Sequence, residues 1–378
     1  MYKRLLMAAA ITAAALSAQA RAEDNFKIGS SLGLTGYAAV IDRAWRDGLE
    51  VAVDALNEKG GLLGKKITLT VEDNHSQPQD AVVGYRKMIS SDQVNLFDSG
   101  CVSAGNFAAA SFVVQAKLPM YLCSILPKRE QEQEWAFSFL APPRFEIESR
   151  YRYLKEKTDI RKVGILYDPT PYALMMKDLG VELAKNFDIE VVAQETYKQD
   201  DSDMSVQLGS FNSAGAGAVI KIGQGGSTVT AAKNIKQLGL DRMLLLASND
   251  DGSIFQQAGQ VLGDRFFFVG PPVQFPKQLK PGPTKDAVDD FLKYWTPKYP
   301  DRDPANAARA WDSMMVLAKA VEIANSTDGA ALRDATEKVP AYTGAYANFN
   351  FSHDEHNGIT ENPFLIGKVV GGELVIAE

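Results

Sequence analysis

The sequence predicts an α/β protein with parallel sheets that are covered on both faces and divided between two domains. Three observations support this prediction. Short apolar strands alternate with amphipathic helices along almost the whole chain. A glycine-rich turn separates a helical period from a strand period. The chain has 378 residues, which is more than one hydrophobic core usually supports.

The clearest pair of elements lies between residues 41 and 81. Apolar residues recur at helical spacing up to residue 56 and predict a helix. The helix is expected to end at Gly60 and Gly61, because a helix C-terminus needs a residue that tolerates positive φ. Apolar residues then alternate with threonines at 67–71 and predict a strand, and Pro78 opens a second helix.

The rest of the chain continues this alternation. We expect further strands at 94–97, 120–122, 162–167, 190–193, 218–222, 243–246 and 266–269. The expected helices cover 104–116, 172–186, 204–213, 227–238, 284–298 and 306–325, followed by a strand-rich tail. Ligands of open parallel sheets bind beyond the carboxyl ends of the strands, so the loops after strands are the candidate sites.

Residues 1–22 have the order of a secretory signal peptide. Lys3 and Arg4 form a charged start, residues 5–18 are apolar, and a small-x-small cleavage site ends at Ala22. The apolar run is shorter and richer in alanine than a membrane span of about 20 strongly apolar residues. We therefore expect cleavage after Ala22 and a free protein in the periplasm.

The charge of the chain argues against two classes of partner. The formal net charge is −7, and removal of Lys3, Arg4 and Arg21 with the signal peptide would make it −10. Such a surface does not favour nucleic acid or an anionic membrane.

Three motifs resemble chemical sites without meeting their requirements. Residues 60–66 lack the spacing of a phosphate loop and follow a helix instead of preceding one. Residues 353–356, His-Asp-Glu-His, lead directly into an Asn-Gly turn and are interpreted as a polar turn. Residues 249–252 lack the closing glutamate of a calcium loop. We therefore expect no metal, no cofactor and no catalytic step.

The run N-E-K-G-G-L-L-G at 57–64, followed by a short strand and then D-N-H-S-Q-P-Q-D-A, resembles the periplasmic branched-chain amino-acid binding proteins. These are type I solute-binding subunits of ABC importers. The A-R-A-W-D-S run at 308–313 is similar to the A-x-x-Y-D-A of that family. The resemblance covers nearly the whole mature chain.

The resemblance implies two Rossmann-like lobes that are joined by a three-segment hinge and close around a ligand. The N-terminal lobe would comprise residues 23–142 and 272–344. The C-terminal lobe would comprise residues 143–271 and 345–378. The first two crossovers would then lie at the proline pairs 142–143 and 271–272, and the third near 343–344.

The resemblance also implies ligand contacts in the N-terminal lobe. Ser103 falls where the family has a serine that binds the ligand carboxylate, and a serine at a helix start suits an anion. Leu126 falls where amino-acid binders often carry a threonine that helps to hold the ammonium, and leucine offers no oxygen. The other expected contacts in this lobe are Tyr37, Ala104, Ser124 and Ile125.

In the C-terminal lobe, Tyr172 matches the lid aromatic of the family and Gln224 falls near a contact of variable identity. Asn249 falls near the acid that pairs with the ligand ammonium, and Asp250 takes that place if the register differs by one residue. Arg144 is either an extra cation for an anionic ligand or a hinge arginine paired with Glu146 or Glu148.

The two cysteines, Cys101 and Cys123, allow two interpretations. The resemblance places the strands before them side by side, within reach of a disulfide in an oxidising compartment. The alternative is two small buried thiols. A catalytic cysteine would need a histidine partner, and the chain has only His75, His353 and His356.

These patterns together predict a monomeric substrate-binding subunit that delivers a small organic carboxylate, aromatic or aliphatic, to the membrane permease of an ABC importer. Binding of branched-chain or other amino acids or amides is the alternative ligand class. A ligand sensor for a membrane receptor would share the fold and the site. An exported α/β enzyme would need an activated nucleophile or a metal, and no such group is evident in the sequence.

Overall fold

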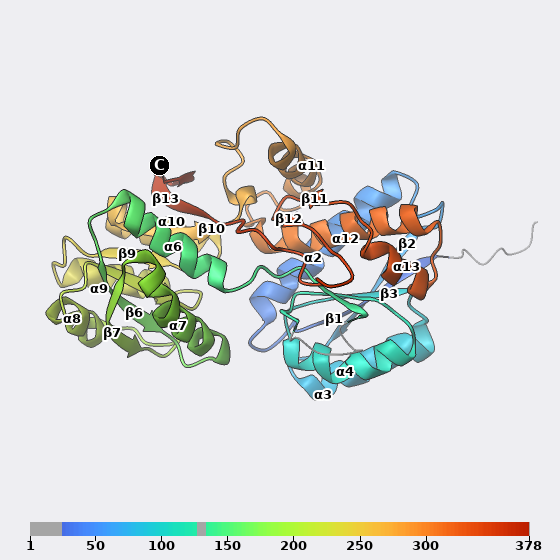
Figure 1. Cartoon of the computed structure of the whole chain (residues 1–378), viewed down its shortest axis with the longest axis horizontal. Coiled ribbons are helices and arrows are strands. Elements are labelled where there is room, and N and C mark those ends of the chain that lie inside the picture. Colours follow the sequence, from blue (N-terminus) through green and yellow to red (C-terminus); the bar gives the residue numbers. More distant parts are fainter. Residues whose placement is uncertain (1–24, 127–133, 378) are drawn as a thin grey trace, which may run out of the picture.

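The computed structural model describes residues 25–126 and 134–377. The chain forms two lobes that lie side by side, each with a central sheet between layers of helices (Figure 1). Both sheets are dominated by parallel strands, so the predicted α/β fold with two lobes is confirmed.

The sheet of the first lobe has five parallel strands in the order β2-β1-β3-β4-β5. Their bounds are β1 Phe26–Leu32, β2 Ile67–Asp73, β3 Leu96–Ser99, β4 Met120–Leu122 and β5 Ala136–Ser138. Helices α3 (Pro78–Lys87, continued by a π turn at Met88–Asp92) and α4 (Ser103–Gln115) pack on one face. The other face carries α2 (Ala39–Glu58), α11 (Pro283–Lys298), α12 (Ala305–Ala324) and α13 (Gly329–Thr336).

Helices α2 and α12 pack closely although their sequences are far apart. A Cβ atom on Gly48 of α2 would lie 2.2 Å from the carbonyl oxygen of Ala307 in α12. Only glycine permits this approach of the two backbones. The contact fixes α12, from the later part of the chain, against α2, the first helix of the lobe.

The sheet of the second lobe has the order β14-β13-β10-β9-β8-β6-β7. Its parallel strands are β6 Lys162–Tyr167, β7 Glu190–Thr196, β8 Ala218–Ile222, β9 Leu244–Ala247 and β10 Phe266–Gly270. Two antiparallel strands, β13 Leu365–Val370 and β14 Glu373–Ile376, complete one edge. One face is covered by α6 Arg144–Lys157 and α7 Pro171–Ala184, and the other by α8 Ser205–Ser213, α9 Ser227–Gln237 and α10 Gly252–Leu262.

The chain passes between the two lobes three times. It leaves β5 for α6 through residues 139–143, and it leaves β10 through a 3₁₀ turn at Pro272–Gln274 that leads towards α11. The third passage comes after the short hairpin of β11 (Tyr342–Thr343) and β12 (Asn348–Phe349), before β13.

The third crossover was expected near residues 343–344, and this boundary is wrong. Phe349, Phe351 and Ile359 pack in the same core as Phe137 and Phe139 of the first lobe. Asn357 also bridges to Ser138 at the edge of the first sheet. These apolar contacts keep residues 345–359 on the first lobe, so the chain crosses only shortly before β13.

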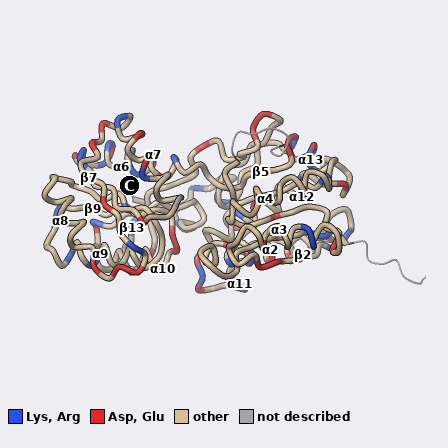
Figure 2. The backbone as a smooth tube through the Cα atoms, turned by 90° about the horizontal axis from the view of Figure 1, so that it is seen from below, with Lys and Arg blue, Asp and Glu red and all other residues tan. Residues whose placement is uncertain are grey.

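Two further properties describe the molecule as a whole. None of the helices between residues 25 and 377 that the structure describes is long and apolar enough to cross a bilayer. Figure 2 shows acidic and basic residues interspersed over both lobes, so that neither sign forms a continuous face in that view.

Candidate ligand-binding site

The two loops that follow β1 and β3 are held together by one carboxylate. Asp42, near the start of α2, accepts hydrogen bonds from the backbone N–H of Gly33 (2.6 Å) and of Cys101 (2.7 Å). The side chain is fully buried, and burial raises its pKa to about 6 in spite of the two hydrogen bonds. Asp42 therefore positions both loops as one unit.

The ends of β3 and β4 are also joined covalently. The structure has a disulfide between Cys101 and Cys123, whose Cα atoms are 4.6 Å apart. The two strands are parallel neighbours, with Ser99 opposite Leu122. Of the two cysteine states that the sequence left open, the structure therefore contains the bonded one.

Ser103 and Ser124 meet beside this disulfide. Their hydroxyl oxygens are 2.9 Å apart, and Asn106 donates to Ser124 from its side-chain amide at 3.2 Å. Ser103 is the first residue of α4, and no side chain caps that helix end. The next residue, Ala104, is exposed. These groups form a small cluster of hydroxyls at the N-terminus of a 13-residue helix.

The residues after Ser124 diverge. Ile125 is half-buried, whereas Leu126 packs into the core between the sheet and helices α3 and α4. The backbone N–H of Leu126 donates to the side chain of Asn357 at 3.0 Å. Leu126 therefore serves the core of the first lobe.

In the second lobe, Gln224, Asn249 and Asp250 lie together after β8 and β9. Gln224 donates to the backbone oxygen of Asn249 at 3.1 Å. Asp250 accepts from the backbone N–H of Gly225 (2.6 Å) and of Asp251 (2.7 Å). Burial raises the pKa of Asp250 to about 6. Each oxygen of its carboxylate thus accepts one backbone N–H.

Three predicted residues lie at exposed positions. Tyr172, at the start of α7, is 43% exposed, although burial around its hydroxyl, and next the charge of Glu146, raise its pKa well above the ordinary value. Tyr37 is 75% exposed. Arg144 is exposed with its guanidinium 5.0 Å from the ring centre of Phe145, and no ion pair joins it to Glu146 or Glu148 within the described chain.

Sequence reasoning missed a pair of buried charges on α6. Glu146 accepts from the backbone N–H of Asn249 at 3.2 Å. Arg150 is 0% exposed and donates from Nη1 to the backbone oxygen of Lys221 (3.0 Å) and to the hydroxyl of Ser248 (3.3 Å). Among the residues that the structure describes, its Nη2 has no partner. Burial lowers the pKa of Arg150, which the charge of Glu146 partly offsets.

A second buried arginine comes from the first lobe. Arg309 of α12 is 4% exposed and contacts the side-chain oxygen of Asn306, the sulfur of Cys123 (3.6 Å) and the ring of Tyr346 (4.9 Å to its centre). The charge of Arg309 also lowers the pKa of Glu146, although burial of Glu146 outweighs this and raises it overall. Arg309 therefore lies near enough to the second lobe to influence its buried acid.

Weak signals for these groups were present in the sequence. Arg309 is the one charged residue in the alanine-rich run 305–311. Arg150 lies on α6, a helix whose many charges hide its apolar face, and this helix was not predicted.

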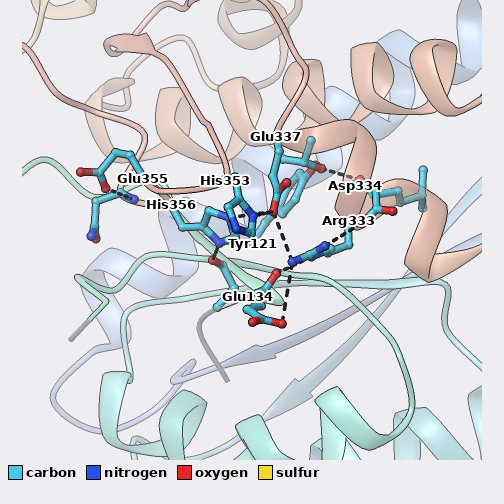
Figure 3. Close-up of polar contacts among 12 residues, drawn as sticks. Tyr121, Glu134, Arg333, Asp334, Glu337, His353, Glu355 and His356 are labelled. Atoms are coloured by element: carbon cyan, nitrogen blue, oxygen red, sulfur yellow. Dashed lines mark hydrogen bonds and ion pairs between the residues drawn. The ribbon is translucent and has the colours of Figure 1, made fainter. Parts of the chain in front are cut away.

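The two histidines of the turn at residues 353–356 meet an acid that also pairs with an arginine. Figure 3 shows both histidines directed at Glu337, with His356 Nε2 at 3.2 Å and His353 Nδ1 at 3.7 Å from one carboxylate oxygen. Arg333 reaches the same oxygen at 3.3 Å. Within the described residues no group of three or more His, Cys, Asp or Glu side chains is placed to hold a metal ion. The cluster ties this turn to the residue that follows α13.

Comparisons with known proteins agree with this architecture. The family model described as periplasmic binding protein matches residues 25–373. The Leu/Ile/Val-binding protein homolog 7 of Brucella suis is 23% identical over 360 residues, which cover 91% of this chain and 89% of that protein.

Two solved structures share the fold over almost the whole chain. The periplasmic binding protein type 1 of Bordetella pertussis has a TM-score of 0.76 and 25% identity and is matched over 94% of this chain and 100% of that one. The branched-chain amino acid transporter substrate binding protein LivJ of Streptococcus pneumoniae, solved with isoleucine, has a TM-score of 0.75 and 19% identity, over 94% and 99% of the two chains.

The resemblance seen in the sequence is thus confirmed by a match along nearly the full length. The chain belongs to the periplasmic binding protein family, in the group that contains the branched-chain amino-acid binding proteins of ABC importers.

Proposed function

We propose that this protein is exported with cleavage after Ala22 and acts as the monomeric substrate-binding subunit of an ABC importer. It captures a small organic carboxylate between the two lobes and presents it to a membrane permease. No catalytic step is part of this proposal.

The main support for a carboxylate ligand is that the buried acids beside the proposed site already accept hydrogen bonds from the protein. Asp42 and Asp250 each accept two backbone N–H groups, and Glu146 accepts one and lies beside Arg150. An ammonium group buried without a free acid would cost several kcal/mol. This favours a ligand without a positive charge.

Donors for an anion, in contrast, are available in the first lobe. The hydroxyls of Ser103 and Ser124 lie at the N-terminus of α4, where the helix dipole favours negative charge. We expect the apolar or aromatic body of the ligand to contact Ile125 of the first lobe and Tyr172 of the second.

A free amino acid is the second candidate ligand. The Brucella relative carries a Leu/Ile/Val-binding name, and LivJ was solved with isoleucine. The buried carboxylate of Glu146 would then be the acid that meets the ligand ammonium.

A matched ligand panel separates these two candidates. Leucine, 4-methylpentanoate and 4-methylpentanamide share one carbon skeleton; leucine adds an α-ammonium to the carboxylate, and the amide replaces the carboxylate with a neutral group. Phenylalanine and 3-phenylpropanoate form an aromatic pair. A ligand at about a hundred times its dissociation constant should add roughly 2.7 kcal/mol of stability in a thermal-shift assay.

We expect stabilisation by at least one of the carboxylates and none by the amino acids. Stabilisation by leucine, isoleucine or valine alone would overturn the carboxylate class and leave the family assignment intact. S103A should weaken carboxylate binding about tenfold through the loss of one hydrogen bond to a charged group. S213A, on the outer helix α8, is the matched control and should leave binding unchanged.

A further inference from the structure

The guanidinium of Arg309 has only neutral direct partners. The side chain is 4% exposed, and its contacts are the Asn306 oxygen, the Cys123 sulfur and the Tyr346 ring. Its Nε has no hydrogen-bond partner among the described residues. No carboxylate of the described chain lies within 4.0 Å of it, since no ion pair with Arg309 occurs there.

Two acids influence Arg309 from a longer distance, and both are engaged elsewhere. Asp42 holds the backbone N–H groups of Gly33 and Cys101. Glu146 holds that of Asn249, and the charge of Arg150 acts on it more strongly than the charge of Arg309. A buried cation with open donors and no close counter-charge is costly unless another anion meets it.

Arg309 also lies at the strand end where the hydroxyl cluster is found. Its Nη1 is 3.6 Å from the sulfur of Cys123, the residue that precedes Ser124. Ser124 in turn lies 2.9 Å from Ser103, oxygen to oxygen. A carboxylate at this end of β4 could accept from a hydroxyl and from the guanidinium together.

We propose that Arg309 is the residue that selects a carboxylate ligand and rejects the corresponding α-amino acid. This inference rests on the proposed function and names the side chain that distinguishes an anionic ligand from one that carries an ammonium group. The guanidinium donates charge-assisted hydrogen bonds to the ligand carboxylate. An ammonium on the α-carbon would bring a second cation towards Arg309 and would be repelled.

The test is isothermal titration calorimetry of the mature full-length protein with 4-methylpentanoate and 3-phenylpropanoate and their neutral amides. R309Q should lower carboxylate affinity about 10- to 100-fold, which is the effect of removing a hydrogen bond from a charged donor. Affinity for the amide should hardly change, so the preference for acid over amide should disappear. R242Q changes an exposed arginine just before β9, outside the proposed site, and should keep the wild-type preference.

A loss of acid preference in R309Q, with R242Q unchanged, supports the inference, because a merely structural role would weaken acid and amide alike. Wild-type affinity and acid preference in R309Q would overturn it while leaving the proposed function intact. A wild-type protein that binds none of the carboxylates would instead refute the proposed function.

Since Arg309 is buried, R309K provides a second variant in case R309Q does not fold. Lysine keeps the charge and loses the planar fork of donors. A roughly tenfold loss for the carboxylate without a loss for the amide supports the inference. Unchanged affinity for both in R309K would overturn it.

Discussion

Asp98 shows how a single buried carboxylate organises the first lobe. It lies in β3 and accepts hydrogen bonds from the indole N–H of Trp45 in α2 (3.0 Å) and the hydroxyl of Ser313 in α12 (2.6 Å). Burial outweighs both bonds and raises its pKa to about 7. Asp312, which accepts from the backbone N–H of Ala345 and Tyr346, has a pKa of about 7 for the same reason.

These raised values predict a pH dependence of stability. A carboxyl group whose pKa is higher in the folded state contributes stability that is complete below its ordinary pKa and is lost as the pH rises through the folded pKa. For Asp98 the window runs from about pH 4 to about pH 7, and the integrated effect is on the order of 4 kcal/mol. Wild-type stability should therefore fall across this window.

D98N should show a shallower fall, because the amide does not titrate. The substitution is tolerable because the hydroxyl of Ser313 can donate to Ala310 instead, at 2.8 Å. Urea unfolding at pH 4, 5.5 and 7 measures the slope. D241N, at an exposed site, should keep the wild-type slope, and equal slopes in D98N and wild type would contradict the prediction.

At the scale of single residues, the sequence could indicate positions that follow strands. Ser103 and Ser124 were predicted together and lie 2.9 Å apart. Arg309 could not be assigned to the site, because its relation to Cys123 depends on α12 packing across a sheet whose strands end more than a hundred residues earlier in the chain. Residue type alone does not reveal such a contact.

At the scale of elements, the disulfide between β3 and β4 gives a second prediction. The bridge closes a segment of 22 residues, for which the chain-entropy model gives about 3 kcal/mol of stabilisation. The double variant C101S/C123S should lose about that much free energy of unfolding in urea. Reduction of the wild type by a phosphine should have the same effect.

The double variant also supplies the control for that measurement. The phosphine should leave its stability unchanged, since it has no bridge to reduce. A wild type that is equally stable with and without the reductant would contradict the prediction.

Most strands and helices were predicted within about two residues, because their apolar periods are clear. The elements that were not predicted are β1, β5, α6, α10 and α13. Helix α6 buries Glu146 and Arg150 among its charges, so its face does not appear apolar. Asp251 caps the N-terminus of α10, because its side chain accepts from the backbone N–H of Ser253. From the sequence alone, this polar segment is interpreted as a strand end. Tertiary contacts determine the secondary structure of such segments, so the local spacing of apolar residues does not reveal it.

At the scale of the whole molecule, one carboxylate links the lobes beside the hinge. Asp303 of the first lobe accepts from the backbone N–H of Gly252 in the second lobe (2.9 Å) and from the side chain of Gln274 at the second crossover (2.9 Å). Asp303 thus joins the start of α10 in the second lobe to the second crossover.

Closure of the lobes on a ligand should make the protein more compact. Small-angle X-ray scattering should give a smaller radius of gyration when 4-methylpentanoate, or another ligand that stabilises the protein, is saturating. A compound that does not change the melting temperature should leave the radius unchanged. A saturating ligand without compaction would argue against hinge closure.

The division into lobes was only partly readable from the sequence. The proline pairs at 142–143 and 271–272 lie where the chain does leave each sheet for the other lobe. The third passage carries no such mark, because residues 345–359 are held by the aromatic side chains of Phe137, Phe139, Phe349 and Phe351. Aromatic packing, rather than a local turn signal, sets the boundary between the lobes at this point.

The discontinuity of the first lobe has a consequence for the order of folding. The five parallel strands of the second sheet all come from residues 162–270, whereas the core of the first lobe joins Phe26 and Ile28 to Trp311 and Met314. The chain is made from its N-terminus, so one face of the first sheet stays uncovered until α12 has been synthesised. The five parallel strands of the second lobe can pair while the first lobe is still open, so the part of the chain made first keeps an apolar sheet face exposed until α12 has been made.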